Sequence, residues 1–148
     1  MNLHKKTILV VEDNPDHLEL TLLSLQGDGN THEMAVAYDG AQALDYLFGQ
    51  GAHSGRDTTD QPELVLLDLK LPKLTGLEVL QRMREDPRTA TVPVVILTSS
   101  SEQEDIMACY QGGANSFVRK PVNFADYADK LRQVQAYWLR VNESRAAG

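Results

Sequence analysis

Residues 64–72 read LVLLDLKLP, in which four apolar residues lead directly into the carboxylate of Asp68. An unbroken apolar run of this length is typical of a strand that is buried on both faces. Such strands occur in parallel sheets that have helices packed on both sides. A carboxylate that closes a buried strand is unfavourable unless the protein uses it, so Asp68 is the first candidate for function.

The same kind of strand recurs on both sides of this stretch. Apolar runs at 7–11, 34–37, 92–97 and 116–118 predict four more strands. Segments with apolar residues at helical spacing follow them, and the last such segment covers 124–141. This alternation predicts an α/β fold of the (βα)5 type, a doubly wound parallel sheet. We expect one domain over 1–148, with a core of about 7–141 and a frayed tail.

Polar residues at the predicted helix starts support this division. Asn14 followed by Pro15 is a typical N-cap and first helical position. Ser101 and Glu104 match a capping box for the fourth helix, and Asn123 is the predicted cap of the last helix.

Charge and composition exclude several classes of protein. The net charge of -7 gives no general electrostatic help in binding nucleic acid or anionic lipid. The single cysteine, Cys109, rules out an internal disulfide and a multi-cysteine metal site, and its helical neighbours indicate packing. No apolar stretch is long enough to span a bilayer, and the first residues do not resemble a signal peptide. We therefore expect a cytoplasmic protein with no nucleic-acid or membrane partner.

Chemically useful side chains follow four of the five predicted strands. Glu12 and Asp13 end the first strand, Asp68 the third, Thr98 the fourth and Lys120 the fifth. The carboxyl ends of the strands share one edge of an open α/β sheet, so these side chains should meet there. Three close carboxylates repel one another unless a cation pairs with them, and Mg²⁺ prefers carboxylates together with phosphate oxygens and water. A nucleophile, a metal and positioned donors are what phosphoryl transfer to a carboxylate requires.

Four motifs carry a family resemblance: VVEDNP at 10–15, LLDLKLP at 66–72 with Gly76 downstream, ILTSS at 96–100 and FVRKP at 117–121. In this order they resemble the receiver domain of two-component response regulators, up to about residue 141. The resemblance implies a flavodoxin-like strand order of 2-1-3-4-5. It also implies that Asp68 accepts a phosphoryl group from a phosphohistidine on a sensor histidine kinase.

The resemblance assigns roles to the other residues at the sheet edge. Glu12 and Asp13 match the acidic pair that holds Mg²⁺ together with Asp68, and the backbone carbonyl of Lys70 would complete that site. Such a protein signals to a protein partner by changing conformation. It is not an enzyme on external substrates, and only weak self-catalysed dephosphorylation is expected.

Three more residues match the parts that sense the phosphoryl group. Thr98 and Lys120 match the residues that grip it, and Phe117 matches the aromatic switch position that turns inward as Thr98 moves. Ser100 lies two residues after Thr98 and borders the expected position of attacking water.

Some features depart from the commonest receiver pattern. The first acid is Glu12 rather than Asp, Phe117 has no hydroxyl, and the loop over 49–62 is long. The long loop, the sequence DNP at 13–15 and the late aromatic pair at 137–138 resemble the stand-alone regulators that accompany bacterial and cyanobacterial phytochrome kinases. The expected kinase is then a bacteriophytochrome, whereas the output target stays open.

Other functions remain as alternatives. A phosphatase of the haloacid dehalogenase type would need a second Asp two residues after the nucleophile, where this chain has Lys70. A transcription factor is disfavoured because one helix and a short tail remain after Lys120. A passive scaffold is separated from a receiver by its response to a phosphoryl donor with Mg²⁺. The four histidines share no ligand-like spacing and are interpreted as surface residues: His4, His17, His32 and His53.

The last predicted helix carries an apolar stripe with alternating steps of three and four residues. Its members are Phe124, Tyr127, Leu131, Val134, Trp138 and Val141. This heptad-like seam predicts a homodimer through the fourth helix, the fifth strand and the last helix. The alternative is that Trp138 folds back onto its own domain.

Overall fold

The computed structural model describes residues 6–26 and 32–145, and within them five parallel strands form one sheet. The strands are β1 (Lys6–Val11), β2 (His32–Ala37), β3 (Leu64–Asp68), β4 (Val94–Thr98) and β5 (Ser116–Arg119). Their order is β2-β1-β3-β4-β5, which confirms the predicted flavodoxin-like topology. The three inner strands are almost wholly buried, as their unbroken apolar runs predict.

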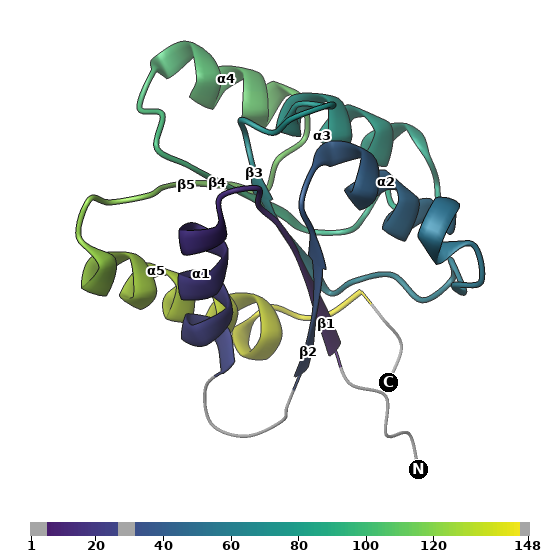
Figure 1. Ribbon diagram of the computed structural model, residues 1–148, viewed down its shortest axis with the longest axis horizontal. Coiled ribbons are helices and arrows are strands. Elements are labelled where there is room, and N and C mark those ends of the chain that lie inside the picture. Colours follow the sequence, from purple (N-terminus) through teal and green to yellow (C-terminus); the bar gives the residue numbers. More distant parts are fainter. Residues whose placement is uncertain (1–5, 27–31, 146–148) are drawn as a thin grey trace.

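Five α-helices cover the two faces of the sheet. They are α1 (Pro15–Gln26), α2 (Gly40–Phe48), α3 (Gly76–Glu85), α4 (Gln103–Gln111) and α5 (Phe124–Ala136). Helices α1 and α5 lie together on one face, and α2, α3 and α4 cover the other (Figure 1). Each face has its own core, because alternate residues of a strand point to opposite sides. No helix among the described residues is long and apolar enough to cross a membrane.

Strand register brings the chemically useful residues to one edge. Asp68 ends β3 and lies opposite Leu97 of β4. Thr98 ends β4 and lies opposite Arg119, the residue before Lys120. Glu12 follows β1 and donates its backbone N–H to the carbonyl of Ala37. The strand ends therefore converge as the sequence predicts.

Two of the predicted helix caps are confirmed. The side chain of Asn14 accepts hydrogen bonds from the backbone N–H groups of Asp16 and His17, at 2.9 and 3.1 Å. The side chain of Asn123 accepts from the first turn of α5 in the same way. Both helices consequently begin where the sequence predicts.

The predicted capping box of the fourth helix is wrong. The residue that caps α4 is Glu102, and its side chain makes no capping hydrogen bond, so Ser101 and Glu104 do not play those parts. Ser100 makes the side-chain contacts at this helix start instead. Its hydroxyl lies 2.5 Å from Asp105 Oδ2 and accepts a hydrogen bond from the N–H of Glu102. The first turn of α4 is thus tied to the loop that follows Thr98.

Arg56 connects the loop over 49–62 to the end of α2. A short 3₁₀ helix, η1 (Gly51–His53), opens the loop, and Arg56 folds back over the ring of Tyr46 at 4.0 Å. The guanidinium donates to the carbonyls of Tyr46 and Asp60 at 2.7 and 2.8 Å. This long loop is a defined extension of α2.

The predicted dimer seam is wrong for two of its members. Tyr127 and Leu131 are 2% and 0% exposed, because this side of α5 packs against α1 and the sheet. The helix continues as a π-helical turn, η2 (Tyr137–Val141), in which Trp138 also packs against this core together with Val134. Trp138 therefore folds back onto its own domain.

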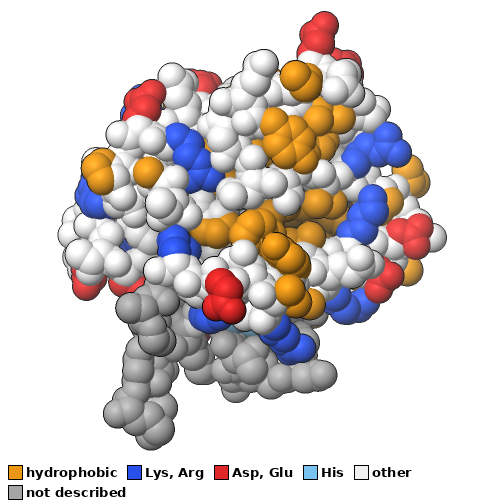
Figure 2. Space-filling view, turned by 180° about the vertical axis from the view of Figure 1, so that it is seen from behind, with side chains coloured by type: hydrophobic (Ala, Val, Ile, Leu, Met, Phe, Trp, Pro, Cys, Tyr) orange, Lys and Arg blue, Asp and Glu red, His pale blue; other side chains and the backbone are white. Residues whose placement is uncertain are grey.

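Part of the predicted interface is nevertheless exposed. Phe124 is 61% exposed, and Met107 and Tyr110 of α4 are also open to solvent. Figure 2 shows hydrophobic side chains gathered on the back of the molecule, seen from the side opposite to that of Figure 1.

Candidate functional site

Three carboxylates meet at the carboxyl edge of the sheet. Oxygens of Glu12, Asp13 and Asp68 lie within 4.8 Å of one another, the only such group of metal-ligand type over residues 6–26 and 32–145. Glu12 and Asp68 are buried, whereas Asp13 faces solvent. Backbone N–H groups orient the buried pair: Asn14 donates to Glu12 Oε2 and Lys70 to Asp68 Oδ1, both at 3.2 Å. The structure brings together the acids that the sequence singles out.

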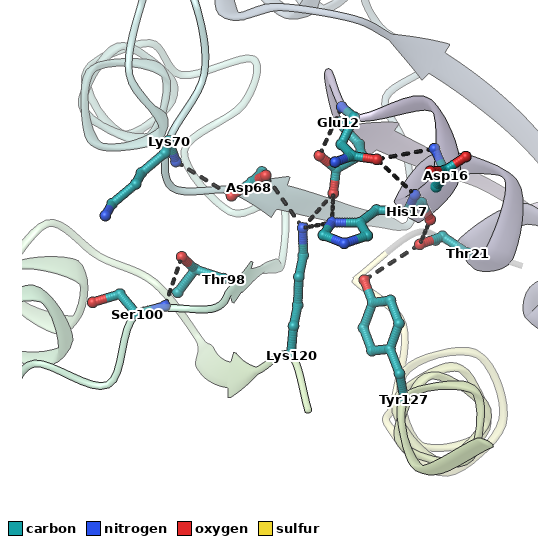
Figure 3. Close-up of polar contacts among 11 residues, drawn as sticks. Glu12, Asp16, His17, Thr21, Asp68, Lys70, Thr98, Ser100, Lys120 and Tyr127 are labelled. Carbon is teal, nitrogen blue, oxygen red and sulfur yellow. Dashed lines mark hydrogen bonds and ion pairs between the residues drawn. The ribbon is translucent and has the colours of Figure 1, made fainter. Parts of the chain in front are cut away.

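Lys120 pairs with two of these carboxylates (Figure 3). Its Nζ lies 2.5 Å from Glu12 Oε1 and 3.2 Å from Asp68 Oδ2, and the side chain is nearly buried. The backbone N–H of Lys120 donates to the carbonyl of Thr98 at 2.8 Å, which fixes the start of this side chain beside β4. The predicted meeting of Lys120 with Asp68 at the sheet edge is confirmed, and the shorter contact to Glu12 is additional.

Burial and charge shift the pKa values of this pair. Burial raises the pKa of Asp68 to about 6, and the nearby Glu12 carboxylate adds to the rise while Lys120 acts against it. For Lys120, burial would lower the pKa, but the carboxylates of Asp68 and Glu12 outweigh it and raise the pKa. The site therefore holds more negative charge than one ammonium can neutralise.

The chemistry of this site fits a hard divalent cation. Mg²⁺ and Mn²⁺ take oxygen ligands, and a cluster with one solvent-facing carboxylate leaves room for water and phosphate oxygens. Glu12, Asp13 and Asp68 would supply the side-chain ligands. The role of the Lys70 carbonyl as a further ligand stays a prediction.

Thr98 ends β4, the strand that pairs with β3, and Phe117 lies on β5, the next strand along the sheet. Thr98 is buried, and its hydroxyl accepts a hydrogen bond from the N–H of Ser100 at 3.3 Å. Phe117 is half-buried and packs against the core under α2, α3 and α4. The switch role of both residues stays a prediction.

The loop that follows Asp68 is closely packed at one glycine. A Cβ at Gly76 would lie 2.4 Å from the carbonyl oxygen of Asp68, closer than any side-chain carbon can approach. Thr75, which precedes it, caps α3 by a complete capping box with Glu78. Close packing against Asp68 therefore explains why glycine stands at position 76, downstream of the LLDLKLP motif.

His17, interpreted as a surface residue, is partly exposed but also contacts the side chains of the site. Its Nδ1 lies 3.2 Å from Lys120 Nζ and 3.9 Å from Glu12 Oε1, and its side chain is 35% exposed (Figure 3). Burial and the Lys120 ammonium lower the pKa of this imidazole, which favours the neutral form. The sequence holds one indication of this contact. Asn14 caps α1, which places residue 17 in the first turn of the helix, directly after the acidic pair.

Comparison with known proteins identifies a family for this chain. Residues 8–132 match the model of the response regulator receiver domain. The chain is 38% identical over 137 residues to the probable methanogenesis regulatory protein FilR2 of Methanothrix harundinacea, covering 93% of this chain and 86% of that protein.

Solved structures extend the likeness to the whole fold. The phosphorylated cyanobacterial phytochrome response regulator RcpA superposes with a TM-score of 0.90 at 31% identity, over 97% of this chain and 100% of that one. The Mn²⁺-bound form of response regulator Rcp1 gives 0.88 at 33% identity, over 95% and 99%. The resemblance to phytochrome-associated regulators is thereby confirmed, and the chain belongs to the response regulator receiver domain family of two-component systems.

Proposed function

We propose that this receiver domain accepts a phosphoryl group on Asp68 from a phosphohistidine of a sensor histidine kinase, in a Mg²⁺-dependent reaction. The observation that carries the proposal is the buried Asp68 carboxylate, which meets Lys120 on one side and two further acids on the other. Such a group combines the nucleophile with the charges that phosphoryl transfer needs.

The chemical step is a displacement at phosphorus. A carboxylate oxygen of Asp68 forms the new P–O bond while the P–N bond to the kinase imidazole breaks, and its electron pair returns to that nitrogen. The Lys120 ammonium, 3.2 Å from Asp68 Oδ2, is placed to pair with an oxygen of the incoming phosphoryl group. A bound Mg²⁺ would neutralise charge on the phosphoryl oxygens. Its ligands would be Glu12, Asp13, Asp68 and the carbonyl of Lys70.

Thr98 and Phe117 are proposed to carry the signal away from Asp68. The Thr98 hydroxyl already accepts from Ser100, whose own hydroxyl meets Asp105 in the first turn of α4. Movement of Thr98 toward a phosphoryl oxygen would therefore pull on α4 and free space for the Phe117 ring. This ring can act by packing alone, because it has no hydroxyl.

The comparisons suggest the partner and the setting. A similar structure is that of a phytochrome response regulator, which supports a bacteriophytochrome as the kinase. We propose that the protein acts in the cytoplasm on a protein target and turns over no external substrate beyond its own aspartyl phosphate. A second structure holds Mn²⁺, in agreement with a divalent cation at the acidic cluster.

We also propose a homodimer, through a smaller surface than the apolar stripe predicts. Tyr127 and Leu131 belong to the core, so an interface over α4, β5 and α5 would use exposed residues such as Phe124 and Tyr110. Apolar side chains gathered on one face are typical of protein interfaces.

The response to beryllofluoride tests the proposed function. With Mg²⁺ present, this phosphoryl mimic should shift the amide NMR signals of residues in β4, β5 and α4 in the wild type. The same addition to Asp68→Asn should shift none of them. An unchanged wild-type spectrum would favour the passive scaffold.

A further inference from the structure

His17 completes a set of three acceptors around the Lys120 ammonium. The Nζ atom lies 3.2 Å from His17 Nδ1, 3.2 Å from Asp68 Oδ2 and 2.5 Å from Glu12 Oε1. An ammonium has three N–H donors, so these contacts use all of them. His17 comes from the first turn of α1, whereas the two carboxylates follow β1 and β3 (Figure 3).

A divalent cation and the Lys120 ammonium compete for the same carboxylate. Glu12 is a candidate metal ligand, and it is also the acceptor closest to Lys120. Two cations beside one carboxylate repel each other, so cation binding weakens the pairing of Lys120 with Glu12, its shortest contact. Asp68 faces the same cation, so the neutral nitrogen of His17 is the one acceptor of Lys120 on which the cation does not draw.

We propose that His17 is a positioning residue that holds the Lys120 ammonium on the α1 side when a divalent cation takes Glu12, an inference that rests on the metal-dependent function proposed above. An ammonium that pairs with two carboxylates depends little on a third acceptor. An ammonium whose carboxylates are both shared with a divalent cation depends on it more, because a buried donor without a partner is unfavourable. His17 should therefore favour the metal-bound state over the metal-free state.

The inference is tested by Mn²⁺ affinity, measured by electron paramagnetic resonance at pH 8 on the wild type, His17→Leu and His17→Asn. His17→Leu should weaken Mn²⁺ binding by about three- to tenfold, less than a fully buried hydrogen bond to a charged group would, because the imidazole is partly exposed. His17→Asn places an amide oxygen near the position of Nδ1 and should restore most of the affinity. His17 is far from fully buried, so both variants are expected to fold.

A second background shows whether His17 acts through Lys120. In Lys120→Ala, the further change His17→Leu should leave the Mn²⁺ affinity unchanged, because no ammonium remains to be positioned. Equal affinities of wild type and His17→Leu would overturn the inference and leave the proposed function standing. A wild type that binds no Mn²⁺ would overturn both, and a His17→Leu effect that persists without Lys120 would overturn the positioning role.

Discussion

The buried carboxylate of Asp68 should reduce the stability of the metal-free protein, and Asp68→Asn should restore it. Burial raises the pKa of Asp68 from 3.8 to about 6. A folded pKa above the unfolded value means that the folded protein holds the proton more tightly, so stability is lost as pH rises through this range. At about 1.4 kcal/mol for each pKa unit, the full loss is about 3 kcal/mol at pH 8. It falls to about 1 kcal/mol at pH 4.5.

Asn keeps the shape of the side chain and removes the charge. It also removes the ion pair with Lys120, which retains Glu12 and His17 as acceptors. We therefore expect a gain of about 3 kcal/mol at pH 8, because the pKa of about 6 already includes the attraction between Asp68 and Lys120. For a domain of this size the gain corresponds to a rise in Tm of about 6–12 °C.

Urea unfolding in EDTA at pH 8 and pH 4.5 provides the measurement. The gain of Asp68→Asn over wild type should fall from about 3 kcal/mol at pH 8 to about 1 kcal/mol at pH 4.5. Asp129→Asn is a matched control, since this carboxylate is exposed on α5 and its substitution should have the same small effect at both pH values. A gain that is independent of pH, or a loss of stability at pH 8, would refute the electrostatic reasoning.

Three further predictions follow from packing and contacts. Gly76→Ala should lower the free energy of unfolding by about 1–3 kcal/mol, because its Cβ would collide with the carbonyl of Asp68, and urea unfolding measures this. Thr98→Ala should still be phosphorylated, as mass spectrometry can show, but its amide NMR response to beryllofluoride should shrink; a full response would contradict the switch. Phe124→Glu should shift a dimer to monomer in sedimentation equilibrium without changing stability, whereas an unaffected dimer would place the interface elsewhere.

Most of the fold could be predicted from the sequence because the central strands are buried on both faces. Residues 64–67 are apolar without interruption and are wholly buried in β3, so a single run identifies a strand, its parallel pairing and its two covering layers. The meeting of Asp68 with Lys120 follows as well. In a parallel sheet each strand ends at the same edge, so sequence position alone brings the two residues together.

Contacts that depend on the rotation of a helix could not be predicted in this way. Steps of three and four residues along α5 define an apolar stripe, but they do not say whether it faces the sheet or another chain. The burial of Tyr127 and Leu131 shows that the middle of the stripe covers the core, whereas Phe124 at its start is exposed. His17 was missed for the same reason, because its contact with Lys120 depends on how the first turn of α1 is set against β5.

The fourth helix shows the limit of a local motif. Ser101 and Glu104 have the spacing of a capping box, and yet Ser100 makes the hydrogen bonds at this helix start. Ser100 is held by the loop after Thr98, to whose hydroxyl it also donates its N–H. The contacts of Ser100 with Thr98 and Asp105 thus replace the capping box that the spacing of Ser101 and Glu104 predicts.

Phosphotransfer from a labelled sensor histidine kinase tests the central claim most directly. A phosphorylated bacteriophytochrome kinase is mixed with the wild type or with Asp68→Asn, with Mg²⁺ or with excess EDTA, and the label on each protein is followed. The wild type with Mg²⁺ should take up close to one phosphoryl group, as an alkali-labile aspartyl phosphate. Asp68→Asn, and the wild type in EDTA, should take up none. Stoichiometric labelling of Asp68→Asn, or undiminished transfer in EDTA, would contradict a metal-dependent phosphoacceptor at Asp68.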